Sequence, residues 1–401
     1  MKVIKGIVIF LIVTGLAVFA CLMFMPIDTF IAEKSAKVEG YDVPTGYDDG
    51  LYRYYYNKLN DKEQIAYRIV YAAFAATEDE FPTQIVIPKL SNNELEEMYT
   101  AISYDNPQFY FLGNKCSMTS IGSVNYLVPQ YIMTLKDYKA SWAVVSLKAD
   151  SIIASIPTVA NTDYEKELYI HDYLVQNSEY DDSNNALVYT MHGVLVDGRA
   201  NCEGYSRTMQ YLLRAANIYN YLAVGDAEGE SGVFTGHMWN IVSIDNEFYN
   251  LDVTWDDYAV AGSVDYPDNS VSHVFFNMAT DDIKKSHNID DNSAWKNCKS
   301  DSYGYYKKSG LYFKSYSGSA ERAMKDALTE SLNSGYNSVE FAFASKSTFD
   351  DAFDRLVTRG GMYGIIVDAN SRVSGDKKID AGSVQYTLDE KNLIMRFFFM
   401  K

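Results

Sequence analysis

The sequence predicts an α+β protein with two or three domains. Residues 61–76 and 141–156 repeat apolar residues at the spacing of a helix face, whereas residues 237–244 alternate apolar and polar residues as a strand does. The chain has 401 residues, of which 47% are hydrophobic, so each domain can bury a core of its own. This composition excludes a disordered protein.

The first segment, residues 1–26, predicts a membrane anchor. Lys2 and Lys5 precede an uncharged run from Gly6 to Pro26 that is long enough to cross a bilayer. Because the positive charges precede the run, we expect the domains that follow it to lie outside the cytoplasm. The run would attach them to the cell membrane. A cleaved signal peptide and a lipoprotein cleavage box ending at Cys21 are the alternatives, and the length of the run favours an uncleaved anchor.

Residues 27–138 are expected to form a tether followed by a region of helices and strands. The first part, residues 27–58, shows no clear period. Beyond it we expect a helix over residues 61–76, a helix from Ser91 to Asp105 with a capping box completed by Glu94, and strands at residues 109–112 and 126–133.

The central domain is expected to cover residues 139–300 and to begin with two helices. The first spans about residues 141–156, and the second starts at Thr162, where Glu165 completes another capping box. His171 lies on the apolar side of the second helix. A packed, hydrogen-bonded histidine is favoured there over a catalytic one.

Residues 301–401 are expected to form a separate small α+β domain. We expect helices near residues 319–333 and 349–356, and strands at residues 339–343 and around Ile365 and Leu393. This region contains neither His nor Cys, so it is a poor location for nucleophilic catalysis.

Charge and motif content exclude several partners and cofactors. The formal net charge of -18 would repel a phosphate backbone, so nucleic acid is not an expected partner. The sequence has no glycine-rich phosphate loop, and its histidines lack the paired spacing of a metal site, so we expect neither a cofactor nor a bound metal. The histidines are His171, His192, His237, His273 and His287.

The cysteines draw attention to one thiol. Beyond Cys21 the chain has Cys116, Cys202 and Cys298, an odd number, so at least one thiol is expected to stay free. Cys116 and Cys298 either pair with each other or remain separate buried thiols. Cys202 stands in the stretch GRANCEGYSRTMQYLL, where a turn at Gly198 precedes apolar residues at helical spacing. A helix N-terminus at this position favours the thiolate, which is the nucleophilic form.

A base and an acid follow in the stretch TGHMWNIVSIDNEFYNLDVTW. A two-residue turn at Asp245 and Asn246 would join a strand that begins at His237 to a returning strand over residues 248–255. In this register His237 and Asp252 share a face as diagonal neighbours, within reach of a hydrogen bond. A four-residue loop preserves the arrangement, whereas a three-residue loop without a bulge would put them on opposite faces.

These residue types are those of acyl-transfer chemistry. Cys202 would attack an acyl carbon, His237 would accept its proton and later protonate the leaving group, and Asp252 would orient the imidazole. The backbone N–H of Cys202 could stabilise the oxyanion, with Tyr180 as a candidate second donor. Taken singly, each of these residues is usually structural, so the residues alone leave both a catalytic triad and a set of structural residues open.

The motifs resemble those of the transglutaminase-like superfamily. The stretches LVDGRANCEGYS, GHMWNIV and YNLDVTWDD follow the family's order, and the upstream YEKELYIHDYLVQNSEYDD is similar to the helical lead-in of bacterial members. The resemblance covers about residues 140–260. It implies a papain-like fold and assigns the triad to Cys202, His237 and Asp252. The family does not require a histidine at His192, which we interpret as structural.

The resemblance implies a function and leaves its last step open. We expect cysteine-dependent acyl transfer or hydrolysis through a thioester, with water as the acceptor in a peptidase and a lysine amine in a crosslinker. The expected substrates are proteins or peptides, such as cell-envelope proteins or peptidoglycan-linked peptides. The alternative is a non-catalytic cell-surface binding or adhesion module on the same fold, for which the 34 tyrosines could supply binding surface.

Overall fold

The chain divides into two compact units, Met1–Ala143 and Val144–Lys401. The predicted anchor run lies outside the described residues, apart from Pro26. Within the described ranges, no helix is both long and apolar enough to cross a bilayer. The predicted domain boundaries at residues 138 and 300 stay predictions. The computed structural model describes residues 26–46, 53–156, 160–229, 232–257, 271–290 and 298–399.

The first unit combines helices with a three-stranded antiparallel sheet of order β1-β3-β2. The predicted helices after residues 60 and 91 are confirmed, and both begin with a capping box, since Glu63 and Glu94 accept from the N-cap amides of Asn60 and Ser91. The elements are α2 (Ile27–Val38), η1 (Tyr56–Lys58), α3 (Asp61–Ala75), β1 (Ile85–Pro88), α4 (Asn92–Asp105), η2 (Pro107–Phe109), β2 (Leu112–Ile121) and β3 (Val124–Tyr131).

Two predictions for the first unit are wrong. The start of the expected tether forms helix α2, because Ala32 and Ala36, one turn apart, are both buried on one face. The strand expected from residue 109 begins only at Leu112. Pro107 sets the backbone dihedral of a helical turn, and residues 107–109 therefore form the 3-10 turn η2.

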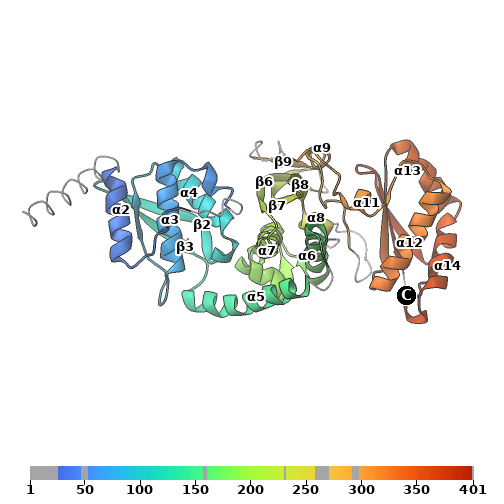
Figure 1. The fold of residues 1–401 in the computed structure, drawn as a ribbon, viewed down its shortest axis with the longest axis horizontal. Helices are drawn as coiled ribbons and strands as arrows, with labels where there is room; N and C mark the ends of the chain where they lie inside the picture. Colours follow the sequence, from blue (N-terminus) through green and yellow to red (C-terminus); the bar gives the residue numbers. More distant parts are fainter. Residues whose placement is uncertain are drawn as a thin grey trace, which may run out of the picture. The chain divides into compact units, whose positions relative to one another are not determined.

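The second unit contains a four-stranded antiparallel sheet of order β8-β7-β6-β9. Helix α7 packs on β6 and β7, and α6 packs on α7 and α8 (Figure 1). The predicted capping box at Thr162 is confirmed, and the predicted helix at 141–156 is α5, which starts six residues earlier. Helix α5 (Leu135–Ser155) begins in the first unit and ends in the second. The elements after it are α6 (Asp163–Asn177), β4 (Glu179–Tyr180), η4 (Ala186–Tyr189), η5 (Gly193–Asp197), β5 (Arg199–Ala200), α7 (Cys202–Ala215), β6 (Asn220–Glu228), β7 (Phe234–Ile244), β8 (Glu247–Leu251), α8 (Val253–Asp256), α9 (Thr280–Ile283) and β9 (His287–Ile289).

The β7–β8 hairpin has the predicted two-residue turn. Asp245 and Asn246 have φ angles of 49° and 65°, as a type I′ turn requires, and the flanking residues 244 and 247 oppose each other. The returning strand is shorter than predicted, because it ends at Leu251 instead of continuing to residue 255. Asp252 then caps the short helix α8, and its carboxylate satisfies two amides that a strand would have paired across the sheet.

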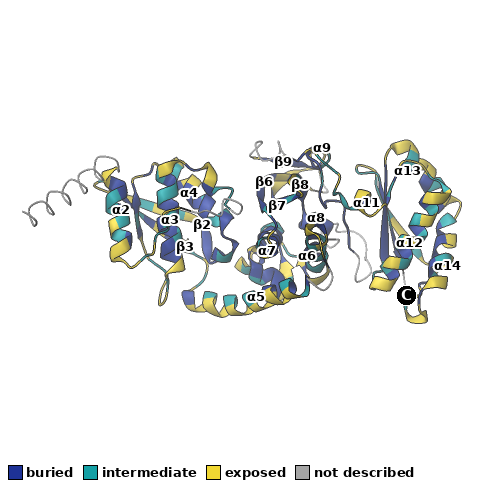
Figure 2. Cartoon of the chain, viewed as in Figure 1, coloured by how far each residue is buried: buried dark blue, intermediate teal, exposed yellow. Residues whose placement is uncertain are grey.

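The C-terminal part of the second unit forms a second sheet, of order β10-β11-β13-β12, in which only β10 and β11 are parallel. Helices α12, α13 and α14 lie on one face of this sheet, with their buried residues toward the strands (Figure 2). The core that they cover also contains Val274 and Phe275. The elements are α11 (Tyr305–Lys308), β10 (Tyr312–Phe313), α12 (Gly318–Ser334), β11 (Ser338–Phe343), α13 (Lys346–Phe353), η7 (Asp354–Thr358), α14 (Gly361–Arg372), η8 (Gly375–Lys377), β12 (Val384–Asp389) and β13 (Ile394–Phe399).

The predicted strand around Ile365 is wrong, because this residue lies in helix α14. Met362, Ile365, Ile366 and Ala369 are all buried, at the spacing of one helix face. The other helices and strands predicted for this region are present, with β13 beginning directly after Leu393.

Gly225 allows β9 to lie against β6. A Cβ atom at this position would lie 1.9 Å from the carbonyl oxygen of Asn288 in β9. We expect Gly225→Ala to lower the free energy of unfolding by about 1–3 kcal/mol, because the backbone of β9 must move. The measurement is the urea midpoint. Gly236→Ala on β7 is the matched control, since nothing lies within 4 Å of its Cβ position. Equal midpoints for the two variants would contradict the tight approach of β9.

Candidate active site

Cys202 is the first residue of helix α7, as the sequence predicts. Asn201 caps this helix, and its side-chain oxygen accepts hydrogen bonds from the amides of Glu203 and Gly204 at 3.1 and 3.2 Å. Gly204 lets the first turn of α7 lie close to the backbone at Val188, since a Cβ atom at residue 204 would be 2.4 Å from the carbonyl oxygen of Val188. The thiol therefore sits at the positive end of a firmly seated helix and is partly exposed.

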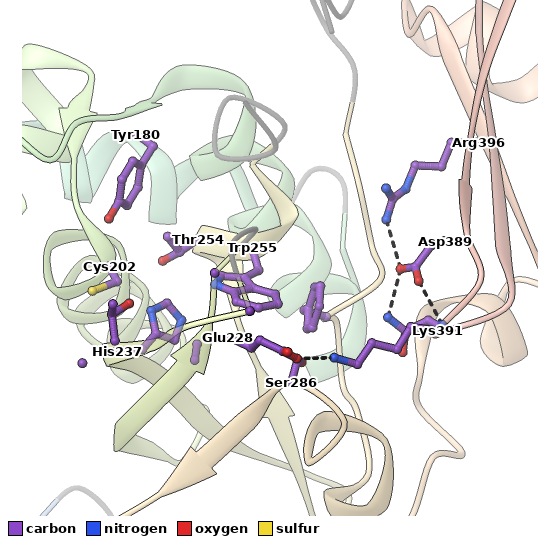
Figure 3. A pocket seen from close by; sticks show the side chains of 17 residues that line it. Tyr180, Cys202, Glu228, His237, Thr254, Trp255, Ser286, Asp389, Lys391 and Arg396 are labelled. Carbon is purple, nitrogen blue, oxygen red and sulfur yellow. Dashed lines mark hydrogen bonds and ion pairs between the residues drawn. The ribbon is translucent and has the colours of Figure 1, made fainter. Parts of the chain in front are cut away.

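His237 and Asp252 meet, as predicted from the hairpin. His237 Nε2 lies 2.7 Å from Asp252 Oδ2. Cys202 lies close enough to His237 to contribute to the rise in its pKa, and because Nε2 faces Asp252, Nδ1 is the ring nitrogen that remains available to the thiol. The structure thus brings the three predicted site residues together, from α7, β7 and the residue after β8. Cys202 and His237 are labelled in Figure 3.

The pair is charged in the folded state. Burial alone would lower the pKa of His237, but the charge and hydrogen bond of Asp252, with a further contribution from Cys202, raise it to about 10. Burial would likewise raise the pKa of Asp252, but the charge and hydrogen bond of His237 hold it well below its usual range. A positively charged imidazolium, held by a carboxylate at one ring nitrogen, can stabilise a thiolate that lies beside its other ring nitrogen.

The structure also places a residue at the site that the sequence analysis missed. His287 Nε2 lies 3.1 Å from Asp252 Oδ2, the same oxygen that His237 contacts, and His287 is fully buried. Its strand, β9, pairs with β6, which lies about sixty positions earlier in the chain. In the sequence, the alternation of His287 with Ile289 indicates a short strand, but it does not indicate which strand this segment pairs with.

A cleft of about 600 Å³ opens over Cys202 and His237. Tyr180, the candidate oxyanion donor, lines this cleft, and its hydroxyl points toward Cys202 (Figure 3). Burial, with a smaller effect of Cys202, raises the pKa of Tyr180 to about 12, so the hydroxyl keeps the proton that a donor needs. Other walls are formed by Trp255 and Phe275 and, from the C-terminal sheet, by Asp389, Lys391, Asn392 and Arg396.

His171 is packed and hydrogen-bonded, in line with the structural interpretation. It is fully buried, with Nδ1 2.9 Å from Asp172 Oδ1 and Nε2 3.2 Å from Asp256 Oδ2. Burial opposes its charge, but the two carboxylates raise the pKa of His171 to about 9. His273 Nε2 contacts the same Asp172 oxygen at 2.9 Å. His192 lies elsewhere, 3.7 Å from Asp197.

Among the residues that the structure describes, two groups of three ionisable side chains come together, of which the sequence predicted only the approach of His237 to Asp252. They are His237, Asp252 and His287, and His171, Asp172 and His273. Hydrogen bonds within each group account for the facing nitrogen and oxygen atoms, so we assign no metal to either.

The other described cysteines differ from Cys202. Cys116 and Cys298 both carry free thiols, as in the unpaired alternative, but only Cys298 is buried and Cys116 is half-buried. Burial raises the pKa of Cys116 to about 11 and that of Cys298 to about 12, which disfavours their reactive thiolates.

Comparison with known proteins agrees with the motifs. Residues 150–253 match the family model described as the transglutaminase-like superfamily, which confirms the resemblance and the α+β class. The segment includes Cys202, His237 and Asp252. Among curated proteins, no sequence matches this chain.

Solved structures include similar chains at low identity. A structure described as a TGase is 17% identical over 43% of this chain and 50% of its own, with a TM-score of 0.26. A "putative cysteine protease" from Cytophaga hutchinsonii is 13% identical over 35% of this chain and 61% of its own, with a TM-score of 0.24. A "putative protease" from Parabacteroides distasonis is 13% identical over 34% and 35%, with a TM-score of 0.21. The matches therefore span less than two thirds of each of these proteins.

The charged state of His237 predicts a pH-dependent contribution to stability. Its pKa is higher in the folded than in the unfolded chain, so the stabilisation is fully present below about pH 6.5 and is lost as the pH rises through about 10. We expect the difference in free energy of unfolding between the wild type and His237→Gln to shrink from about pH 6 to about pH 10. Urea unfolding across this range measures it. A difference that stays constant or grows would show that His237 is not charged in the fold.

Proposed function

We propose, from the premise that residues 150–253 form a transglutaminase-like core, that this protein is a cysteine-dependent acyltransferase or peptidase acting on protein or peptide substrates. One observation carries the proposal. His237 bonds Asp252 through Nε2 at 2.7 Å, and His237 and Cys202 line the same open cleft. A partly exposed thiol at a helix N-terminus beside a buried histidine is the arrangement of an activated nucleophile, and a histidine with a purely structural role would not require it.

In the first half of the reaction, the Cys202 sulfur attacks the acyl carbon of the substrate. The thiol proton resides on His237, and the tetrahedral intermediate carries its negative charge on the former carbonyl oxygen. As the carbon–nitrogen bond breaks, His237 gives its proton to the leaving amine, and a thioester on Cys202 remains. Asp252 keeps Nε2 protonated throughout, so only Nδ1 exchanges a proton.

In the second half, an acceptor attacks the thioester. His237 removes a proton from water in hydrolysis or from a primary amine in transfer, the carbon–sulfur bond breaks, and the thiolate–imidazolium pair is restored. The backbone amide of Cys202 and the hydroxyl of Tyr180 are the proposed donors to the oxyanion in both halves. The two reactions share every residue named so far, so the acceptor decides between peptidase and crosslinker.

We also propose an extracytoplasmic location, with a single N-terminal anchor and cell-envelope proteins or peptidoglycan-linked peptides as substrates. The support is the uncharged run from Gly6 to Pro26 behind Lys2 and Lys5. A protease-protection assay on intact cells tests the location. Degradation of the domains by external protease agrees with it, whereas protection until the cells are lysed contradicts it.

An activated thiol should be selectively alkylated. We expect limiting iodoacetamide to label Cys202 at a pH at which ordinary thiols are still inert, because His237 supports the thiolate. Peptide mass spectrometry on the full chain locates the label, with Cys116 and Cys298 as internal references. His237→Ala should remove the selectivity. Labelling of Cys202 no faster than that of Cys116, and indifferent to His237, would instead favour a binding module on the same fold.

Turnover should depend on the triad in a graded manner. With denatured casein as substrate, Cys202→Ala is expected to abolish activity, and Asp252→Asn to lower the rate by about 10⁴-fold through loss of the required tautomer. A fluorescent primary amine added to the same assay separates the two reactions, since its incorporation indicates transfer and new peptide fragments indicate hydrolysis. Full activity in a folded Cys202→Ala protein would exclude the mechanism.

A further inference from the structure

The carboxylate of Asp252 serves two imidazoles instead of one. Oδ2 lies 2.7 Å from His237 Nε2 and 3.1 Å from His287 Nε2, while Oδ1 accepts from the backbone amides of Thr254 and Trp255. The carboxylate is fully buried. Each of its oxygens thus has two donors, and His287 is the only one of these four donors that the triad and the helix cap do not explain.

The ring of His287 is fixed with its proton toward Asp252. Nε2 faces the carboxylate of Asp252, which can only accept, so a neutral ring carries its hydrogen on Nε2 and accepts at Nδ1. Ser286 Oγ lies 2.9 Å from Nδ1 and 3.4 Å from the carbonyl oxygen of Ile283, and it has one hydrogen to donate to these two acceptors. Burial, together with the nearby charge of His237, outweighs the effect of Asp252 and lowers the pKa of His287, in agreement with the neutral form.

The sheet brings the two histidines to one face. On β6, Gly225 opposes His237 of β7, and Ala227 opposes His287 of β9. Directly opposed residues share a face, and so do alternate residues of one strand, so both rings project on the same side. Only the small residues Gly225 and Ala227 separate them, and the ring centroids approach to 5.3 Å. Asp252 reaches both rings from the end of β8.

One carboxylate charge can balance only one imidazolium in a buried site. His237, which lies close to the thiol, takes that charge, and His287 contributes a neutral N–H donor. This donor shares the negative charge on Oδ2 and limits rotation of the carboxylate, which in turn orients His237. Metal sites use the same principle, because hydrogen bonds from residues that do not touch the metal hold the metal-binding side chains in their orientation.

We propose that His287 is a positioning residue of this site, which holds Asp252 and through it aligns His237 with the thiol of Cys202. The proposal rests on the acyl-transfer function proposed above. It makes Ser286, His287, Asp252 and His237 a continuous chain of hydrogen bonds that ends at His237, which lines the cleft together with Cys202.

The first test measures the rate at which iodoacetamide alkylates Cys202 in the full chain, as a function of pH. We expect His287→Phe, which keeps a ring but no donor, to slow alkylation near neutral pH by about 10–100-fold and to shift the pH profile toward that of an ordinary thiol. His287→Gln, whose amide can donate to Asp252, should recover most of the rate. The matched control is His273→Phe, which removes an imidazole from the equivalent position on Asp172 and should leave the profile unchanged.

A double-mutant cycle separates positioning from packing. If His287 acts through Asp252, adding His287→Phe to Asp252→Asn should change the alkylation rate by less than about 2-fold, whereas an independent packing effect would act in both backgrounds. Ser286→Ala is the variant to use if His287→Phe does not fold, and it should slow alkylation in the same direction by loosening the tautomer of His287.

The outcomes distinguish this inference from the proposed function. A wild-type Cys202 that reacts no faster than Cys116 would overturn both. A reactive wild-type Cys202 whose rate and pH profile are unchanged in folded His287→Phe, or in Ser286→Ala where that variant is the one used, would overturn only the role of His287. A full-size effect of His287→Phe in the Asp252→Asn background would also overturn it, since the residue would then act by packing.

Discussion

The buried carboxylate of Asp252 is the group on which the rest of the candidate active site depends. A charge with no exposure to solvent is tolerable only when donors surround it, and four donors from three parts of the chain do so. They come from β7, from β9 and from the first turn of α8. The burial of Asp252 therefore requires that the end of the β7–β8 hairpin, the first turn of α8 and the edge strand β9 all lie next to its carboxylate.

The nucleophile reaches this site from a separate element, and the separation has a physical reason. A helix N-terminus supplies the amides and the positive dipole end that favour a thiolate, whereas a sheet supplies a rigid face on which His237 can be held. The cleft above them has a wall from the C-terminal sheet, where Lys391 pairs with Glu228 of β6 at 2.7 Å (Figure 3). The C-terminal region thus shapes the cleft over Cys202 and His237 without contributing to the proposed triad.

A second buried network shows what the same residue types do in a structural setting. Asp172 joins His171 to His273, and Glu340 of β11 accepts from the backbone amide of His273 at 3.1 Å. These contacts tie α6 and the segment before α9 to the C-terminal sheet. Both networks pair a carboxylate with two imidazoles, but of the two only the one at Asp252 has an imidazole that lines a cleft together with a thiol, so the proposed function rests on the neighbours of the pair and not on the pair itself.

The sequence by itself determined the features that neighbouring residues control. The helix start at Cys202, the turn at Asp245 and Asn246 and the resulting approach of His237 to Asp252 follow from local preferences and from the fixed periods of helix and strand. Only the tertiary structure decided that β8 ends at Leu251 and that β9 lies beside β6 with His287 on Asp252. The periodicity of a sequence indicates which face of a helix or strand is buried, but not which other element covers that face. Pairing between distant segments depends on packing and on the hydrogen bonds that a buried charge requires.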